Sequence, residues 1–260
     1  MGACVSNDNK NIRDFIKNIE PLDLIVFRGN DLVSDVIGGM EALETGNGSV
    51  SHVEIMITPY WCEIIDPSGA IDSDHALSWG STMSQGATTS VETGKSVFGV
   101  QIRDLELLIG DYVAAGGNVG YCKLIANPIL KNSDETLSEY LIRRNKLKEN
   151  ISDAHRKYHN TPYNANPFAL LGAMFPSLRW LRDEVAQEFH LANKWLFCSE
   201  FIAALYIDLG IIDDLTDGVA DGKVLDPADV LPVDLLGYDA DHGIVNAICH
   251  SPVWLINKKT

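Results

Sequence analysis

The stretch FCSEFIAALYIDLG, residues 197–210, carries a strong helix pattern that ends at Gly210. Cys198 stands at the start of this helix, where the helix dipole favours a thiolate and backbone N–H groups can hold an oxyanion. The alternative is a buried structural cysteine, which is the more common role for a cysteine within a helix. The position at the helix N-terminus favours the nucleophile.

A cysteine nucleophile needs a base, and His52 is the candidate. It lies in SHVEIMI, residues 51–57, where alternate residues from Val53 to Ile57 are apolar, so this segment predicts a strand. A histidine on a strand that faces a helix N-terminus can pair with the thiolate and then protonate a leaving group. The alternative is an exposed or hydrogen-bonded strand histidine that takes part in no chemistry.

The group that orients His52 is expected on the segment that follows it. Residues 51–69 predict a strand, a turn at Thr58-Pro59 and a returning strand, which would bring Glu63 or Asp66 opposite His52. The register of this hairpin decides between the two carboxylates, and the sequence does not fix the register. Glu63 is preferred, because Asp66 precedes a proline and suits the turn.

Strand patterns dominate the first half of the chain and helix patterns the second, which predicts an α+β fold. Residues 1–11 are polar and predict a flexible tail, and residues 12–260 predict a single domain. Residues 70–96, rich in Ser, Thr and Gly, predict a long surface loop inserted in that domain, and residues 133–195 a helical elaboration. The remaining expected elements are strands at 23–29, 97–105, 120–128 and 251–257, and helices at 12–19, 31–43, 133–159 (capped by Ser133 or Asp134) and 168–190.

Charge and cysteine usage exclude several classes of function. The 260 residues carry a formal net charge of −16 at pH 7, which repels nucleic-acid phosphates, so no nucleic-acid partner is expected. Five cysteines without a CxxC pair favour a reducing compartment over a disulfide framework or a zinc ribbon. His155 and His159 stand four residues apart, as metal ligands can, but no Glu follows His155, and they are interpreted as a solvated helix face. Neither a metal nor a cofactor is expected.

The first six residues, MGACVS, match the pattern that presents Gly2 for myristoylation. One myristoyl chain binds membranes only marginally, and the charges of residues 1–20 balance, so Cys4 is the candidate for a second, palmitoyl anchor. The alternative is a plain tail with a free thiol. Acylation would place the protein on the cytoplasmic side of a membrane, in a eukaryotic cell or in a virus that infects one.

The order of the motifs resembles the circularly permuted papain-fold hydrolases of the NlpC superfamily, which include bacterial and poxvirus-type members and are related to lecithin–retinol acyltransferase. The motifs lie within residues 21–235 and read DLIVFRG, SHVEIMI, CEIIDPSG, NTPYN, FCSEFIAALYIDLG and LDPADVLP. The resemblance implies a circularly permuted papain-like fold, with an antiparallel sheet packed against helices, the histidine early and the cysteine late. The sequence departs from the pattern at Glu54 and Leu22, where glycines are usual, and Glu54 puts a charge beside the site.

The resemblance also implies a mechanism, with Cys198 as nucleophile, His52 as base, Glu63 as the orienting residue and Tyr163 as an oxyanion donor. The alternative for Tyr163 is a turn aromatic that packs on the core. The expected enzyme is a thiol hydrolase, peptidase or acyltransferase that acts on peptide amide or lipid acyl bonds through a thioester. The alternative function is a catalytically inactive, membrane-tethered binding or virion structural protein with the same fold.

Overall fold

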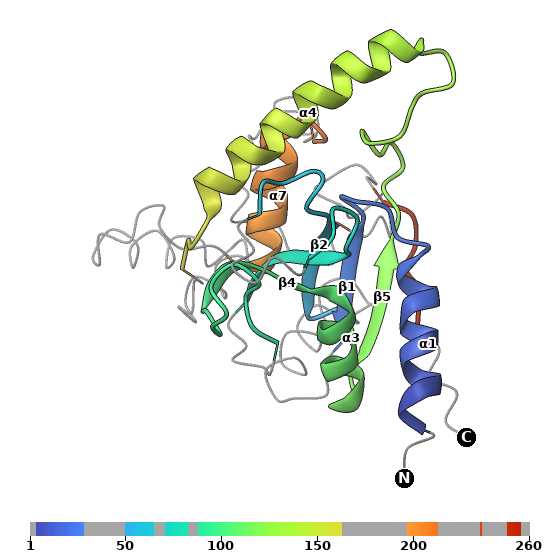
Figure 1. The fold of residues 1–260 in the computed structure, drawn as a ribbon, viewed down its shortest axis with the longest axis vertical. Coiled ribbons are helices and arrows are strands. Elements are labelled where there is room, and N and C mark those ends of the chain that lie inside the picture. The colour runs from blue at the N-terminus through green and yellow to red at the C-terminus, as the bar shows by residue number, and fades with distance from the viewer. Residues whose placement is uncertain are drawn as a thin grey trace, which may run out of the picture.

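The computed structural model describes residues 4–28, 50–64, 71–82, 88–162, 197–212, 235 and 249–255. They form an α+β fold, as the sequence predicts, in which a six-stranded antiparallel sheet packs against helices (Figure 1). The strands follow the order β4-β3-β2-β1-β5-β6 across the sheet. Their bounds are β1 Leu24–Arg28, β2 His52–Ile57, β3 Leu77–Thr82, β4 Gly99–Asp104, β5 Asn118–Cys122 and β6 Val253–Trp254.

The sheet is buried on both faces, and β1 contributes to both cores. Leu24 and Val26 belong to the larger core, which contains side chains of α4 (Leu137–Tyr158) and α7 (Cys198–Asp208). Ile25 and Phe27 belong to the smaller core, which contains side chains of α1 (Cys4–Ile16) and α3 (Leu105–Ala114). Each such apolar side chain stabilises the fold by about 1.5–3 kcal/mol when fully buried. In Figure 1, α4 crosses α7 on one side of the sheet, and α1 lies beside α3.

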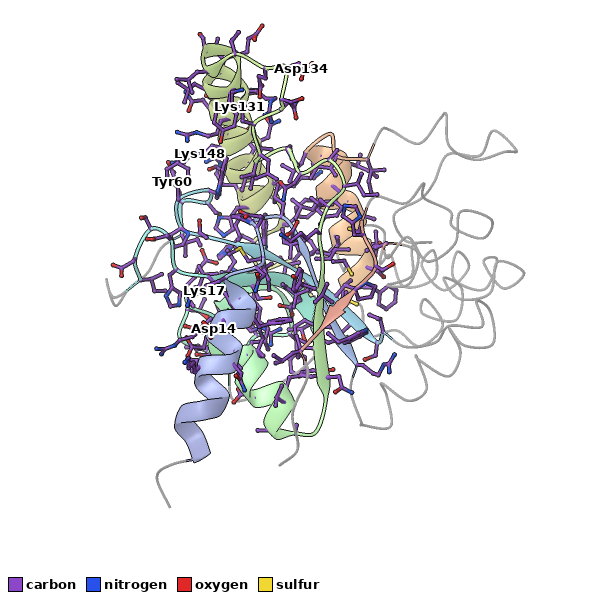
Figure 2. The ribbon with its side chains drawn as sticks, turned by 90° about the vertical axis from the view of Figure 1, so that its right-hand side faces the viewer. Asp14, Lys17, Tyr60, Lys131, Asp134 and Lys148 are labelled. Carbon is purple, nitrogen blue, oxygen red and sulfur yellow. The ribbon has the colours of Figure 1, made fainter. Side chains whose placement is uncertain are left out.

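The prediction of a hairpin after β2 is wrong for the residues that the structure describes, because residues 58–64 form a turn instead of a returning strand. The backbone N–H of Trp61 donates to the carbonyl of Thr58 at 2.9 Å, and the indole is buried in the larger core. The turn also contacts α4, since the ammonium of Lys148 lies 4.6 Å from the ring centroid of Tyr60 (Figure 2). The second antiparallel partner of β2 is β3, which pairs Ile55 with Trp79.

β3 lies within the segment expected to be a surface loop, and its small residues explain the difference. The strand reads LSWGST, a composition typical of loops. Ser78 Oγ donates to the carboxylate of Glu54 on β2, and a Cβ added at Gly80 would lie only 2.7 Å from the Cδ of Glu54. Serine and glycine therefore occupy β3 because larger side chains would overlap a buried carboxylate.

Helix α7 is confirmed, and the turn after it contains Gly210 with a φ of 68°, a conformation that favours glycine at helix ends. Helix α4 begins later than expected, and its cap is Thr136 instead of Ser133 or Asp134. The hydroxyl of Thr136 accepts from the backbone of Glu139, whose carboxylate accepts the backbone N–H of Thr136 at 2.9 Å. Such a capping box needs a Glu or Gln three residues after the cap, which only Thr136 among the three has.

Helix α1 is longer than the sequence pattern predicts, and helix α3 was not predicted. Helix α1 begins at Cys4, so residues 4–11, expected to belong to a flexible tail, are helical. It lies against α3, with an ion pair of 2.8 Å between Arg13 and Glu106, while Asp14 and Lys17 pair at 2.8 Å on its exposed side (Figure 2). Helix α3, which the sequence reading did not include, follows β4 directly and is capped by Asp104.

The expected helices at 31–43 and 168–190 lie outside the described residues. The expected strands at 23–29, 97–105 and 251–257 are confirmed as β1, β4 and β6, with shorter bounds. The strand expected at 120–128 is confirmed only in part, because β5 spans Asn118–Cys122 and so begins and ends earlier than expected. None of the helices in the described ranges is both long and apolar enough to cross a bilayer.

Candidate active site

His52 opens β2 and is held there by its neighbours on the sheet. It pairs with Phe27 of β1, and the two rings lie 5.4 Å apart between centroids. Only 17% of its side chain is exposed. The ring is thus fixed at the end of a central strand, and two different groups contact it.

Cys198 is the first residue of α7 and is itself buried, with 6% exposure. The preceding residue, Phe197, has the extended backbone of a helix cap, and its N–H donates to the carboxylate of Glu200 at 3.1 Å. The backbone N–H groups of Ser199 and Val53 donate to the sulfur. Two donors therefore already stabilise negative charge at this position.

The structure brings Cys198 and His52 together, with the thiol and the imidazole in a side-chain hydrogen bond. Burial disfavours the ionised sulfur, but the charge and hydrogen bond of His52 outweigh it and hold the pKa of Cys198 below its usual range. Burial likewise disfavours the imidazolium, yet the sulfur and the carboxylate of Glu54 raise the pKa of His52 to about 9. The two shifts have opposite directions, as they do in a thiolate–imidazolium pair.

The carboxylate that contacts His52 is that of Glu54, two residues along the same strand. Its Oε1 lies 2.8 Å from Nε2 of His52, so Nδ1 is the nitrogen left for the sulfur. Glu54 is fully buried and also accepts from Ser78 and from the guanidinium of Arg103 on β4. Burial alone would raise the pKa of Glu54, but Arg103 and His52 lower it to about 2. The carboxylate is therefore ionised at neutral pH.

The sequence analysis predicted Glu63 in this orienting role, but the carboxylate that contacts His52 in the structure is that of Glu54. Glu63 is exposed and lies in a surface hollow with Lys148 and Arg156 of α4. The correction follows from the missing hairpin, because the turn at 58–64 carries Glu63 away instead of back across β2. Glu54 was detectable in principle, since side chains at positions i and i+2 of a strand share a face.

Several other expected site residues lie outside the described part of the chain. Asp66, the alternative orienting residue, and Tyr163, the expected oxyanion donor, are among them, as is Gly2, the expected myristoylation site. Cys4 begins α1, and its side chain is not described. The geometry of the site therefore consists of Cys198, His52 and the groups around Glu54.

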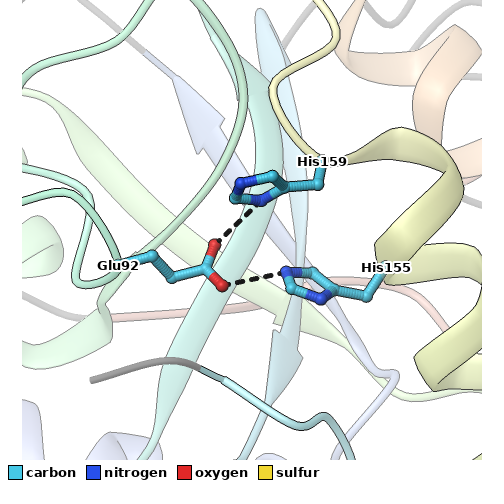
Figure 3. A group of neighbouring side chains, drawn as sticks. All are labelled: Glu92, His155 and His159. Carbon is cyan, nitrogen blue, oxygen red and sulfur yellow. Dashed lines mark ion pairs between the residues drawn. The ribbon is translucent and has the colours of Figure 1, made fainter. Parts of the chain in front are cut away.

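His155, interpreted with His159 as a solvated helix face, is a second correction, whereas His159, the C-cap of α4, is exposed as expected. The His155 residue is only 9% exposed, and its ring stacks edge-on against Trp79 with a centroid distance of 5.8 Å. Both imidazoles lie beside the carboxylate of Glu92, from the segment between β3 and β4 (Figure 3). Sequence spacing could show the two histidines on one helix, but it could not show which carboxylate the fold brings to them.

The sequence matches no protein-family model and none of the curated proteins. The chemistry of the site therefore follows from its geometry. A buried thiolate beside an imidazolium can attack an electrophilic carbon, and the imidazolium can then protonate a leaving group. A buried carboxylate on the far nitrogen keeps the ring oriented through both steps.

Proposed function

We propose that the protein is a thiol hydrolase or acyltransferase with a Cys198–His52–Glu54 triad. The observation that carries the proposal is the hydrogen bond between the Cys198 thiol and the His52 ring, with the pKa of the thiol lowered and that of the imidazole raised. The chain order, with an early strand histidine and a late helix cysteine, supports a circularly permuted papain-like fold of the NlpC type.

The reaction begins with attack of the Cys198 thiolate on a carbonyl carbon of an amide or ester. The oxyanion that forms accepts hydrogen bonds at the N-terminus of α7, where the backbone N–H of Ser199 already points toward the sulfur, with that of Val53 on β2 beside it. As the intermediate collapses, the His52 imidazolium gives its proton to the leaving amine or alcohol, and a thioester remains on Cys198. Water or an acceptor alcohol or amine, deprotonated by neutral His52, then attacks the thioester and restores the thiolate.

Glu54 is a positioning residue in this scheme. Its carboxylate holds Nε2 of His52 and stabilises the imidazolium, while Arg103 keeps the carboxylate ionised. N-terminal acylation at Gly2 and Cys4 would hold the site beside a membrane, which suits peptide or lipid acyl substrates. No nucleic acid, metal or cofactor enters these steps.

The test is the rate at which Cys198 reacts with a small alkylating or acylating probe at pH 7, located by peptide mass spectrometry. Burial raises the pKa of Cys62 and Cys122 to about 12, and that of Cys249 rises as well, so these three thiols should stay unlabelled. In His52→Ala, the thiol loses its counter-ion. A thiol with the usual pKa of 9.0 is about 1% ionised at pH 7, so the rate should fall by up to about 100-fold.

His75→Ala is the matched control, because His75 also contacts a carboxylate, Asp104, at 2.7 Å but has no contact with Cys198 among the described interactions. It should label at the wild-type rate, and Cys198→Ala should not label at this site. Equal labelling of His52→Ala and wild type would refute the triad. An inert Cys198 in the folded protein would favour the other expected function, a tethered binding or virion structural protein.

A further inference from the structure

Away from Cys198, three side chains that sequence spacing did not connect form a compact cluster. Nε2 of His155 lies 3.1 Å from Oε1 of Glu92, and Nδ1 of His159 lies 3.3 Å from Oε2 of the same carboxylate. The ligand atoms of all three residues lie within 4.8 Å of one another. Figure 3 shows the Glu92 carboxylate facing both imidazole rings, with one oxygen toward each.

The elements that carry these residues are well fixed. His155 belongs to the last turn of α4, and the N–H of His159, just beyond it, donates to the carbonyl of His155 at 2.8 Å. Glu92 lies in a turn tied to β4, because the N–H of the neighbouring Val91 donates to the carbonyl of Ile102 at 2.9 Å. The cluster thus joins the end of a helix to the edge strand of the sheet.

Two polar atoms at the centre of the cluster are buried without a hydrogen bond. Within the described ranges, Oε1 of Glu92 and Nε2 of His155 have no hydrogen-bond partner, and their 3.1 Å contact does not have hydrogen-bond geometry. The side chains of Glu92 and His155 are only 5% and 11% exposed. A buried polar atom that lacks a hydrogen bond costs free energy, about 1–3 kcal/mol by mutational data, so a ligand that contacts both atoms would stabilise the fold.

The geometry points to a binding site for one divalent transition-metal ion, held by Glu92, His155 and His159. Two imidazole nitrogens with one carboxylate oxygen suit Zn²⁺ and its neighbours better than Ca²⁺ or Mg²⁺, which prefer oxygen ligands alone. The described residues offer no fourth His, Cys, Asp or Glu at this distance. A water molecule would therefore complete a four-coordinate ion, as it does in open zinc sites.

The distances fit such an ion after a small adjustment. Bonds of about 2.0–2.1 Å at tetrahedral angles place neighbouring ligand atoms about 3.4 Å apart. The two nitrogen–oxygen distances are already 3.1 and 3.3 Å, and the widest separation in the cluster is at most 4.8 Å. Side-chain shifts on the order of 1 Å would close the site around the ion. The net charge of −16 also concentrates cations near the surface.

The test uses the full chain after treatment with a chelator, titrated with Co²⁺ and then with Zn²⁺. Because Cys198 and His52 also offer a thiolate and an imidazole, all titrations are done in the Cys198→Ala variant and repeated in wild type. The variant should bind one Co²⁺, with visible bands of a low-coordinate ion and no thiolate-to-cobalt charge-transfer band. Zn²⁺ should displace it.

Glu92→Gln and His159→Ala in that background should weaken Co²⁺ binding by more than about 100-fold, because even loss of an outer-shell partner costs 10–100-fold. His75→Ala, which removes a histidine paired with Asp104, is the matched control and should bind as the parent does. His155 is left unchanged, because its buried ring supports Trp79.

Three results with the folded Cys198→Ala chain would overturn the inference: no bound Co²⁺, binding that survives in both ligand variants, or a charge-transfer band that shows sulfur as a ligand. Thermal melts of each metal-free variant establish that it is folded before titration. Because the parent lacks Cys198, these outcomes are independent of whether the protein is a thiol enzyme.

Discussion

Replacing Gly80 by alanine should destabilise the fold and slow the chemistry of Cys198 together. The new Cβ would lie 2.7 Å from the Cδ of Glu54 and 3.0 Å from its Cβ, and nearer still to its Cγ. Ordinary contacts begin at 3.4 Å, so the overlap at the carboxyl carbon is about 0.7 Å. Glu54 has little room to yield, because His52, Ser78 and Arg103 all hold its carboxylate.

Two costs and one opposing gain set the size of the effect. Overpacking of a buried site costs about 1–3 kcal/mol. If the carboxylate moves off Arg103, an unpaired buried charge raises the cost to about 3–5 kcal/mol. Alanine loses less backbone entropy than glycine on folding, which offsets about 0.5–1 kcal/mol of this cost. A net loss of about 0–4.5 kcal/mol is therefore expected, with a displaced Glu54 that no longer orients His52.

Urea unfolding and the rate of Cys198 alkylation at pH 7 measure the two effects on the same samples. Gly110→Ala is the matched control, because Gly110 lies inside α3 and a Cβ there meets no atom within 4 Å. That variant should gain about 0.5–1 kcal/mol of helix stability and label at the wild-type rate. If Gly80→Ala is as stable as Gly110→Ala and labels equally fast, Glu54 is not packed against β3 as described.

Two further predictions concern acid stability and the N-terminus. Because the pKa of Glu54 falls from its ordinary 4.5 to about 2 on folding, its stabilisation is complete above pH 4.5 and is lost as pH falls toward 2. Between pH 5 and 3 the free energy of unfolding, measured by chemical denaturation, should therefore fall by about 2 kcal/mol through Glu54. This loss should be absent in Glu54→Gln, whereas Glu63→Gln, which changes an exposed residue, should retain it. Separately, Gly2→Ala expressed in a eukaryotic cell should lose tetradecanoyl incorporation and move to the soluble fraction, and an unchanged distribution would count against the acyl anchor.

The elements that carry Cys198 and His52, the first two members of the proposed triad, could be predicted from local sequence patterns. Helical spacing in α7 and alternation in β2 are properties of neighbouring residues, so Cys198 and His52 could be placed on their elements from the sequence. Their meeting in space was a prediction from the resemblance to permuted papain-like hydrolases. Local pattern alone does not give tertiary proximity.

The missed features depend on partners that are distant in sequence. The sequence pattern predicts an exposed position for Glu54, because a carboxylate without partners is rarely buried. Only the fold shows that Arg103 and Ser78 contact this carboxylate. The sequence of β3 predicts a loop for the same reason. Its serine and glycine are uncommon in strands, and they occur here because they leave room for the buried carboxylate of Glu54. Glu92 joins two histidines that only the fold brings to it.

The position of Arg103 explains why β3 has small residues: they let the guanidinium reach Glu54 and keep its carboxylate ionised. Arg103 lies opposite Ser78 in the pairing of β3 with β4, and it reaches across β3 to Glu54 on β2. Without the guanidinium, burial would raise the pKa of Glu54 and favour its neutral form. The charges then alternate from the Cys198 sulfur through His52 and Glu54 to Arg103. A larger side chain in place of Ser78 would separate Arg103 from Glu54, and the His52 imidazolium would lose its buried counter-ion.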